Sequence, residues 1–282
     1  MPESNLPAEL AAKRQALRGI LRRLGRVLVA YSGGVDSGLL LAEATAVLGA
    51  ENALGVIARS RLMPDEEFRA AVRLAEERGF ALRVMEYDEM AIGGFVANEE
   101  DRCYHCKTEL LKRFSAIARE WGAKALCTGD NLDDEGDFRP GMRALEEAGT
   151  SSPLREARMT KADIRELARR LALPNWDKPS EACLASRVPY GERITAEKLR
   201  AIAEGERLLR AMGFRQRRLR CHGDIARIEI EPQDFEKLLD PATRRKIVDG
   251  LTALGFNYVA MDLAGYRTGS MNETREAKTE KA

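Results

Sequence analysis

The sequence predicts an α/β protein in which a mostly parallel sheet forms a first domain and a smaller α+β domain follows. Three observations lead to this fold class. The chain has 282 residues, enough for two ordinary domains. Strand-like apolar runs alternate with helical patterns over residues 27–131, and beyond residue 191 the order becomes helix, strand, strand, helix and strand.

The elements of the first domain follow from hydrophobic spacing. Leucine and isoleucine side chains at helical intervals predict an amphipathic helix over residues 7–24. Short apolar runs predict four strands, at 27–32, 53–60, 81–88 and 124–131. The helical patterns between them lie at 36–48, 64–79 and about 104–121. Helical crossovers give parallel strands, and ligands of such sheets bind where the carboxyl ends of the strands meet the loops.

A further helix begins with a capping box formed by Thr160 and Asp163 and extends to about Leu171. The next stretch, 174–191, has three prolines and no periodicity, which indicates a long functional loop at a domain junction. We therefore expect a first domain over 1–174 and a cysteine-bearing junction over 175–191.

The second domain is expected over 192–271, as a small antiparallel or mixed sheet with helices on one face. The pattern predicts a helix over 196–212 and strands at 215–222, 225–231 and 258–266, with Asp240 and Pro241 starting the second helix. The tail, 272–282, is charged and is expected to be disordered.

The composition limits the classes of function. The formal net charge is +1, so no overall field favours nucleic acid or an anionic membrane. No apolar run approaches the roughly 20 residues of a membrane-spanning helix, and the charged N-terminus lacks the apolar core of a signal peptide. We expect a cytoplasmic protein whose five cysteines are reduced.

The segment Ser32-Gly-Gly-Val-Asp-Ser37 connects the first strand of the sheet to a helix N-terminus. Its glycines permit positive φ angles and let a ligand approach the main chain. Free amides and the helix dipole favour an anion there, and two serine hydroxyls add donors. A tight turn whose glycines serve geometry alone is the alternative. The flanking serines, Asp36 and the parallel-sheet context favour a phosphate loop, although the segment is neither a Walker A nor a G-x-G-x-x-G motif.

A second polar segment, residues 128–141, follows another strand at the same sheet edge. Asp133, Asp134 and Asp137 are candidates for metal or ribose contacts, and Arg139 is a candidate for a phosphate contact. A solvated acidic turn is the alternative.

Three cysteines are candidates for chemistry. Cys103 and Cys106 form a C-x-x-C pair at the start of a helix, and Cys183 lies in the proline-rich loop. The three thiolates would suit a [4Fe-4S] cluster with one open iron, whereas adding His105 would suit structural zinc. A redox pair is also open. The remaining cysteines are expected in the core: Cys127 and Cys221.

The motif SGGVDS resembles the pyrophosphate loop (PP-loop) of the ATP pyrophosphatase superfamily, which includes GMP and NAD synthetases, argininosuccinate synthetase and tRNA thiolases. The resemblance implies a Rossmann-like, adenine nucleotide alpha hydrolase-like domain that uses ATP and Mg²⁺. It also implies AMP transfer to a substrate oxygen with release of pyrophosphate. Gly38 departs from the pattern, since many members carry Ser or Thr there. The implied ATP and pyrophosphate contacts are Ser32, Gly33, Gly34, Asp36, Ser37, Gly129 and Arg139.

The motifs SGGVDS, RCYHCK, DFRPG, ACLASRVPYG, HGDIARIEI and MDLAGYRTGSMN together resemble the LarE family over about residues 7–272. These ATP-dependent sulfur transferases make the thiocarboxylates of the nickel-pincer nucleotide cofactor of lactate racemase from pyridinium-3,5-biscarboxylic acid mononucleotide. The resemblance implies an enzyme that adenylates a substrate carboxylate and then inserts sulfur, giving a thioacid and AMP. It also implies a homo-oligomer, a trimer or hexamer, and leaves the sulfide donor unidentified.

The family has two sulfur sources: a single sacrificed cysteine, or a [4Fe-4S] cluster on three cysteines. The resemblance implies the cluster type, with Cys103, Cys106 and Cys183 as ligands, while sacrifice of Cys183 stays open. The implied catalytic residues are Cys183 and Asp36. The implied substrate-binding residues are Lys107, Ser186, Arg187, Glu206, Arg218, Arg220, Glu229 and Arg267, for whose charged members exposed salt bridges are the alternative.

Three other functions fit the loop. A tRNA thiolase shares the loop, but the near-zero net charge and the lack of a separate basic RNA-binding domain disfavour it. An ammonia-dependent synthetase of the NAD or GMP type would not need the cysteines. A nucleotide sensor would carry out no chemistry and release no pyrophosphate.

Overall fold

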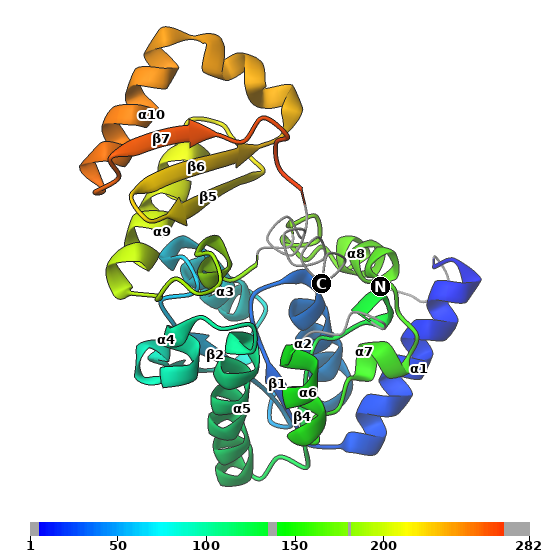
Figure 1. Cartoon of the computed structure of the whole chain (residues 1–282). Helices are drawn as coiled ribbons and strands as arrows, with labels where there is room; N and C mark the ends of the chain where they lie inside the picture. The colour runs from blue at the N-terminus through cyan, green and yellow to red at the C-terminus, as the bar shows by residue number, and fades with distance from the viewer. Residues whose placement is uncertain (1–5, 135–139, 180–181, 268–282) are drawn as a thin grey trace, which may run out of the picture. The chain divides into compact units, whose positions relative to one another are not determined.

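The structure is a computed structural model that describes residues 6–134, 140–179 and 182–267 (Figure 1). It divides into two compact units. The first comprises Met1–Asp88 and Cys103–Ser180, and the second comprises Glu89–Arg102 and Glu181–Ala282. The short segment Glu89–Arg102 thus groups with the C-terminal part of the chain, although in sequence it lies between elements of the first unit. Arg139, Asp137 and the tail 272–282 lie outside the described residues.

The first unit contains a four-stranded parallel sheet with the strand order β3-β2-β1-β4. The strands are β1 (Val27–Ala30), β2 (Ala53–Arg59), β3 (Ala81–Glu86) and β4 (Ala125–Cys127). The crossover helices are α2 (Val35–Leu48), α3 (Asp65–Glu77) and α5 (Arg102–Trp121). This arrangement confirms the predicted α/β fold with a Rossmann-like parallel sheet.

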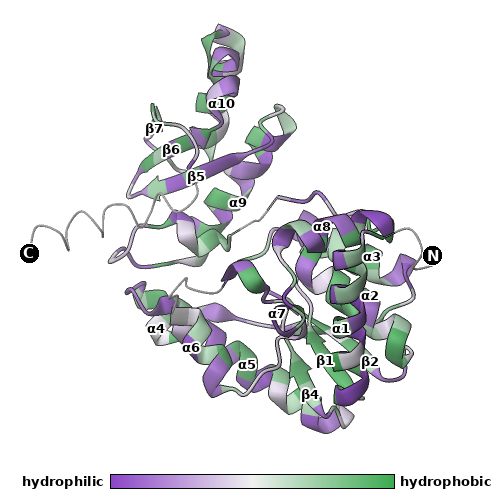
Figure 2. Cartoon of the chain, turned by 90° about the vertical axis from the view of Figure 1, so that its right-hand side faces the viewer, coloured by the Kyte–Doolittle hydropathy of each residue, from purple (hydrophilic) through white to green (hydrophobic). Residues whose placement is uncertain are grey.

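Helices cover both faces of this sheet because the strands are apolar on both sides. Val27 and Val29 of β1 pack in one core with α1 (Ala8–Leu24), α2 and α3, while Leu28 packs in a second core with α5. In Figure 2, β1 is largely green, the colour of hydrophobic residues. The strand order places β1 between β2 and β4. The chain therefore changes direction across the sheet beside β1, and a ligand crevice is expected at that point.

The remaining helices of the first unit are α6 (Pro140–Glu147), α7 (Pro153–Glu156) and α8 (Lys161–Arg170). The predicted capping box of α8 is confirmed, since Thr160 and Asp163 each bond the backbone amide of the other. The strand predicted over 124–131 is wrong at its end, because β4 stops at Cys127. The amide of Thr128 bonds to the carbonyl of Ser151 instead, at 2.9 Å, and the chain leaves the sheet.

The second unit contains a mixed three-stranded sheet with the order β5-β6-β7. Strands β5 (Arg217–His222) and β6 (Ile225–Ile230) are antiparallel, and β7 (Tyr258–Met261) joins β6 in parallel. Helix α9 (Ala196–Ala211) packs on β5, and α10 (Pro241–Ala253) packs on α9 and β7. The close approach of α9 to β5 requires Gly205, since a Cβ there would lie 2.2 Å from Leu219 Cδ2.

Four short elements of the second unit escaped prediction: α4 (Gly93–Ala97) and the 3-10 helices Glu89–Ala91, Leu184–Arg187 and Pro232–Leu239. Short helices have too few turns to show a period. None of the helices in the described ranges is both long and apolar enough to cross a membrane.

Candidate functional site

Gly33, the first glycine of the PP-loop, packs closely against helix α3. Gly33 has φ = +72°, a left-handed conformation that glycine adopts without strain. A Cβ at this position would also lie 2.4 Å from Ala71 Cβ in α3, so no other residue fits without movement. Gly34 is the N-cap of α2, which places the loop amides at the positive end of that helix.

The two serines of the loop bond to each other. The Ser37 hydroxyl oxygen accepts a hydrogen bond from the Ser32 amide at 3.1 Å and lies 3.0 Å from Ser32 Oγ. Ser37 is buried and Ser32 is exposed. The buried hydroxyl therefore holds the loop closed on itself, and the exposed hydroxyl of Ser32 is the one placed to meet a ligand.

The turn after β4 lies against this loop, as the shared sheet edge predicts. A Cβ at Gly129 would lie 3.0 Å from the Ser37 amide nitrogen and 3.3 Å from Asp36 Cβ. Glycine at 129 thus lets the second turn approach the N-terminus of α2. Ser37 and Gly129, which are 92 positions apart in the chain, therefore lie side by side.

Asp36 lies at the centre of a polar cluster between these turns. Its Oδ1 accepts a hydrogen bond from Asn131 Nδ2 at 3.3 Å, and its Oδ2 forms an ion pair with Lys161. The backbone amide of Lys161 bonds to Asp133 Oδ2 at 2.8 Å. Asp134 accepts a bond from the Asn131 amide at 3.0 Å. The two acids of the turn therefore accept hydrogen bonds from backbone amides of the cluster, and Asp36 pairs with its cation.

Lys161 is a site residue that the sequence reasoning missed. It is the first residue of α8, directly after the capping residue Thr160. That position gave a signal, because the capping box fixes where the helix begins and hence which side chains lie at its N-terminal end. The signal did not say that this end faces the PP-loop.

The candidate sulfur ligands lie on two elements of different units. Cys103 and Cys106 are three residues apart in the first turns of α5, so they share one side of that helix; Cys103 is exposed and Cys106 half-buried. The Tyr87 hydroxyl donates to the Cys106 carbonyl at 2.7 Å. Cys183 is exposed. Across the described residues, no group of three or more His, Cys, Asp or Glu side chains is gathered in a way that could hold a metal ion.

The other two cysteines lie in the core, as predicted. Cys127 in β4 is fully buried, and burial raises the pKa of its thiol to about 12. Cys221 in β5 is buried as well, and burial raises its pKa. Neither thiol is suited to act as a nucleophile at neutral pH. Of the other predicted residues, Lys107 in α5 lies against α6: its Cδ is 3.2 Å from the position that a Cβ on Gly141 would take.

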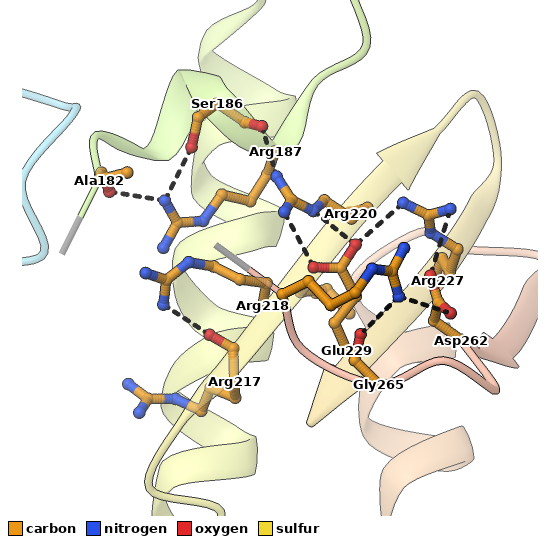
Figure 3. A network of polar contacts seen from close by, with 12 residues as sticks. Ala182, Ser186, Arg187, Arg217, Arg218, Arg220, Arg227, Glu229, Asp262 and Gly265 are labelled. Carbon is orange, nitrogen blue, oxygen red and sulfur yellow. Dashed lines mark hydrogen bonds and ion pairs between the residues drawn. The ribbon is translucent and has the colours of Figure 1, made fainter. Parts of the chain in front are cut away.

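Arg187 holds the segment that bears Cys183. Its Nη1 donates to the carbonyls of Ala182 at 2.6 Å and Cys183 at 3.0 Å, and to Ser186 Oγ at 3.0 Å (Figure 3). Its other nitrogens form a bidentate pair with Glu206 of α9, at 2.8 and 3.0 Å. The side chain is 1% exposed. This buried side chain therefore links the segment that bears Cys183 to α9.

A second bidentate pair joins the two antiparallel strands of the sheet. Arg220 of β5 bonds to both carboxylate oxygens of Glu229 in β6, at 2.9 Å each, and its Nη1 donates to the Ser186 carbonyl at 2.8 Å. Arg227 also bonds to Glu229, at 2.9 Å, and pairs with Asp262 at 3.5 Å. Figure 2 shows β5 as largely purple, in contrast to β1.

These side chains belong to one arginine network. Arg218 donates to the Arg217 carbonyl at 2.7 Å and stacks over Tyr266, and Arg267 lies 3.9 Å from Asp262. Burial raises the pKa of Glu206, but the guanidinium of Arg187, the Leu219 amide and Arg218 together hold it below its usual value. Among the described residues, the network includes three acids, Glu206, Glu229 and Asp262, and six arginines, Arg187, Arg217, Arg218, Arg220, Arg227 and Arg267. Clustered guanidinium groups of this kind suit a ligand with several negative charges.

The parallel sheet, its paired-glycine loop at a helix N-terminus and the adjoining polar cluster define a nucleotide-binding α/β protein of the PP-loop class. Comparisons with known proteins agree with this class. A stretch of 90 residues is 36% identical to the NH3-dependent NAD+ synthetase of Methanopyrus kandleri, covering 31% of this chain and 32% of that protein. No family model matches the chain.

Two relatives match nearly the whole chain. It is 41% identical over 270 residues to the pyridinium-3,5-bisthiocarboxylic acid mononucleotide synthase of Lactiplantibacillus plantarum, which covers 95% of this chain and 96% of that protein. It is 40% identical over 263 residues to an uncharacterized protein of Synechocystis sp., with 93% and 98% covered. The chain belongs to the LarE family of the Lactiplantibacillus synthase. This confirms the predicted family and the prediction of a sulfur-transferring enzyme over those of a tRNA thiolase, an amide-forming synthetase or a sensor.

Proposed function

We propose that this enzyme is an ATP-dependent sulfur transferase that acts on pyridinium-3,5-biscarboxylic acid mononucleotide. A substrate carboxylate attacks the α-phosphate of ATP, which forms an acyl adenylate and releases pyrophosphate. Sulfide then displaces AMP to leave a thiocarboxylate. The observation that carries this proposal is the PP-loop at the point where the sheet changes direction, in a chain 41% identical to the Lactiplantibacillus synthase over 95% of its length.

The pyrophosphate part of ATP would lie over the N-terminus of α2. The amides there and the hydroxyl of Ser32 would donate to phosphate oxygens, and Lys161 would add a cation beside them. Gly129 leaves the second turn close enough to enclose the nucleotide. Arg139 remains a proposed phosphate contact from sequence. Fixed donors of this kind stabilise the charge that develops on the leaving pyrophosphate.

Magnesium fits the carboxylates of this cluster. Asp36 and Asp133 supply the hard oxygen ligands that Mg²⁺ prefers, and they lie on the two turns that enclose the proposed phosphate position. When bound, the ion would neutralise phosphate charge. Asp36 now holds Lys161, so this carboxylate can orient either cation.

The substrate carries two carboxylates and a phosphate, which are groups that guanidinium side chains bind. We propose that Arg218, Arg220 and Arg267 bind these groups, and that Glu229 orients Arg220. Arg187, Glu206 and Ser186 would fix the segment that bears Cys183. Lys107, from the first unit, is proposed as a further substrate or phosphate contact.

The sulfur source is proposed to be a [4Fe-4S] cluster on Cys103, Cys106 and Cys183. The chemistry of the donors supports this proposal, because thiolates are the ligands that such clusters use, and because two of the thiols are exposed and the third is half-buried. When bound, the cluster would offer sulfide at the iron that the protein leaves without a ligand. The chain's own part is to hold the thiols in place, through Arg187 at Cys183 and through Tyr87 at Cys106.

Anaerobic purification with an iron count, followed by a pyrophosphate-release assay with the mononucleotide, tests this proposal. We expect brown protein with about four irons per chain and substrate-dependent pyrophosphate release. Colourless, iron-free protein that thiolates its substrate once and then carries dehydroalanine at Cys183 would establish the sacrificial route instead. No pyrophosphate release with the mononucleotide would refute the proposed reaction. Light scattering tests the proposed homo-oligomer, a trimer or hexamer.

A further inference from the structure

Asn175 contacts the PP-loop from outside the motif. It lies in the turn that follows α8, and its side-chain Nδ2 donates to the carbonyl oxygens of both Gly33 and Gly34, each at 3.1 Å. All three residues belong to the first unit. One side-chain amide therefore bonds the two glycine carbonyls of the loop at the same time.

These two bonds help to fix where the loop amides point, together with the Gly38 amide, which also bonds to the Gly34 carbonyl. In a trans peptide group the carbonyl and the following N–H point in opposite directions, and the described chain has no cis peptide. The carbonyls of Gly33 and Gly34 face Asn175, so the amides of Gly34 and Val35 face away from it, and the Gly34 amide donates to the exposed Ser32 hydroxyl at 3.4 Å. Both amides belong to the start of α2, where the helix dipole is positive.

We propose that Asn175 is a positioning residue of the PP-loop, which aims the Gly34 and Val35 amides at the pyrophosphate portion of ATP. The proposal rests on the proposed ATP-dependent function and adds to it a residue outside the recognised motifs. Asn175 touches the loop backbone, and its effect on ATP passes through that backbone.

Gly38 and Asn175 are matched in size. A Cβ at Gly38 would lie 2.9 Å from Asn175 Nδ2, closer than real contacts allow, so any side chain at residue 38 displaces the amide. The amide of Gly38 also bonds to the Gly34 carbonyl, at 2.9 Å. Glycine at this position in the first turn of a helix costs helix stability. Its presence here is explained by the space that Asn175 occupies.

The turn that bears Asn175 is fixed without help from the PP-loop. The Leu173 amide bonds to the Ala168 carbonyl at 2.9 Å and its side chain is buried, while Lys178 forms an ion pair with Glu67 of α3. The Asn175 Oδ1 atom is buried with no hydrogen-bond partner among the described residues. A flipped amide would place that oxygen against two carbonyls, so the donor side must face the loop.

The test compares Asn175→Ala with a matched control, Asn52→Ala. Asn52 also lies half-buried in the first unit, and its Nδ2 donates to a backbone carbonyl, that of Leu48 at 3.0 Å, at the opposite end of α2 from the loop. Calorimetry would measure the affinity of wild type and both variants for a non-hydrolysable ATP analogue, pyrophosphate and AMP. We expect Asn175→Ala to lower the affinity for the ATP analogue and for pyrophosphate about tenfold, since two oriented bonds are lost. The affinity for AMP should fall less than about twofold. Asn52→Ala should match wild type for all three ligands.

A double-variant cycle with Gly38→Ser distinguishes a lost orientation of the loop amides from a general disturbance of the fold. If the serine acts by displacing Asn175, the double variant should be no weaker than either single variant. Amide hydrogen exchange at residues 34 and 35 should be faster in Asn175→Ala than in wild type. Equal weakening of all three ligands, or affinity for pyrophosphate within twofold of wild type, overturns the positioning role. Wild-type protein that binds neither ATP nor pyrophosphate overturns the proposed function and this inference together.

Discussion

Lys161 and Asp36 form an ion pair although 125 positions separate them in the sequence. Asp36 belongs to the first turn of α2, after the central strand of the sheet, and Lys161 begins α8. The pair brings a cation beside the loop amides, where the proposed pyrophosphate would lie. Because both side chains are only partly buried, the pair itself contributes little to stability. The pair matters because it fixes the position of the positive charge of Lys161.

Replacing Lys161 should therefore affect catalysis more than folding. We expect Lys161→Ala to lower kcat/KM for pyrophosphate release about 100-fold, in the range that loss of one transition-state donor costs. The melting temperature should change by less than about 2 °C, as for other surface ion pairs. Lys161→Arg should recover part of the activity. Wild-type rates in the alanine variant would remove Lys161 from the site.

The packing of Gly33 predicts different outcomes for two glycines with similar φ angles. Gly33 (φ = +72°) and Gly79 (φ = +66°) would each strain an alanine by about 1 kcal/mol. Only at Gly33 would the new methyl group meet another atom, Ala71 Cβ at 2.4 Å; at Gly79 nothing lies within 4 Å. We expect Gly33→Ala to lose ATP binding and at least about 2 kcal/mol more stability than Gly79→Ala. Urea unfolding and calorimetry measure both, and equal losses would contradict this packing.

The buried pair of Glu206 and Arg187 predicts a pH dependence of stability. The pKa of Glu206 in the folded protein lies below its usual value of 4.5. A depressed carboxyl pKa contributes stability that is fully present above 4.5 and is lost as the pH falls toward the folded-state value. Wild type should exceed Glu206→Gln in unfolding free energy at pH 7, and this difference should shrink below about pH 4.5. The exposed pair of Glu204 and Arg207 supplies the control, since Glu204→Gln should change little. If the difference in unfolding free energy between wild type and Glu206→Gln stays constant from pH 7 to pH 3, the ion pair with Arg187 does not stabilise the charged form of Glu206.

Removal of single cysteines distinguishes ligands from core residues. We expect Cys103→Ala, Cys106→Ala and Cys183→Ala to lose most of the iron of anaerobically purified protein, because three thiolates are the whole proposed protein ligand set. Cys221→Ala should keep its iron, since that thiol is buried in the second sheet and its pKa is raised. Full iron content in all three ligand variants would rule out the cluster.

The sequence patterns predicted the features that depend on interactions between residues close together in the chain. The alternation of apolar strands and amphipathic helices gave the parallel sheet, because burial on two faces requires that pattern. The capping box of Thr160 and Asp163 and the glycine loop were recognisable because their bonds span a few residues. The motifs also gave the family, which the relatives confirm.

The sequence alone could not show which distant side chains meet. Asp36 with Lys161, Asn175 with the Gly33 and Gly34 carbonyls, and Arg187 with Glu206 of α9 are contacts between separate elements, and their residues carry no periodic signal. Only the order of strands, which puts β1 between β2 and β4, brings the two turns together at one edge. The residue types fix which bonds are possible, and the packing of helices on the sheet selects the bonds that form.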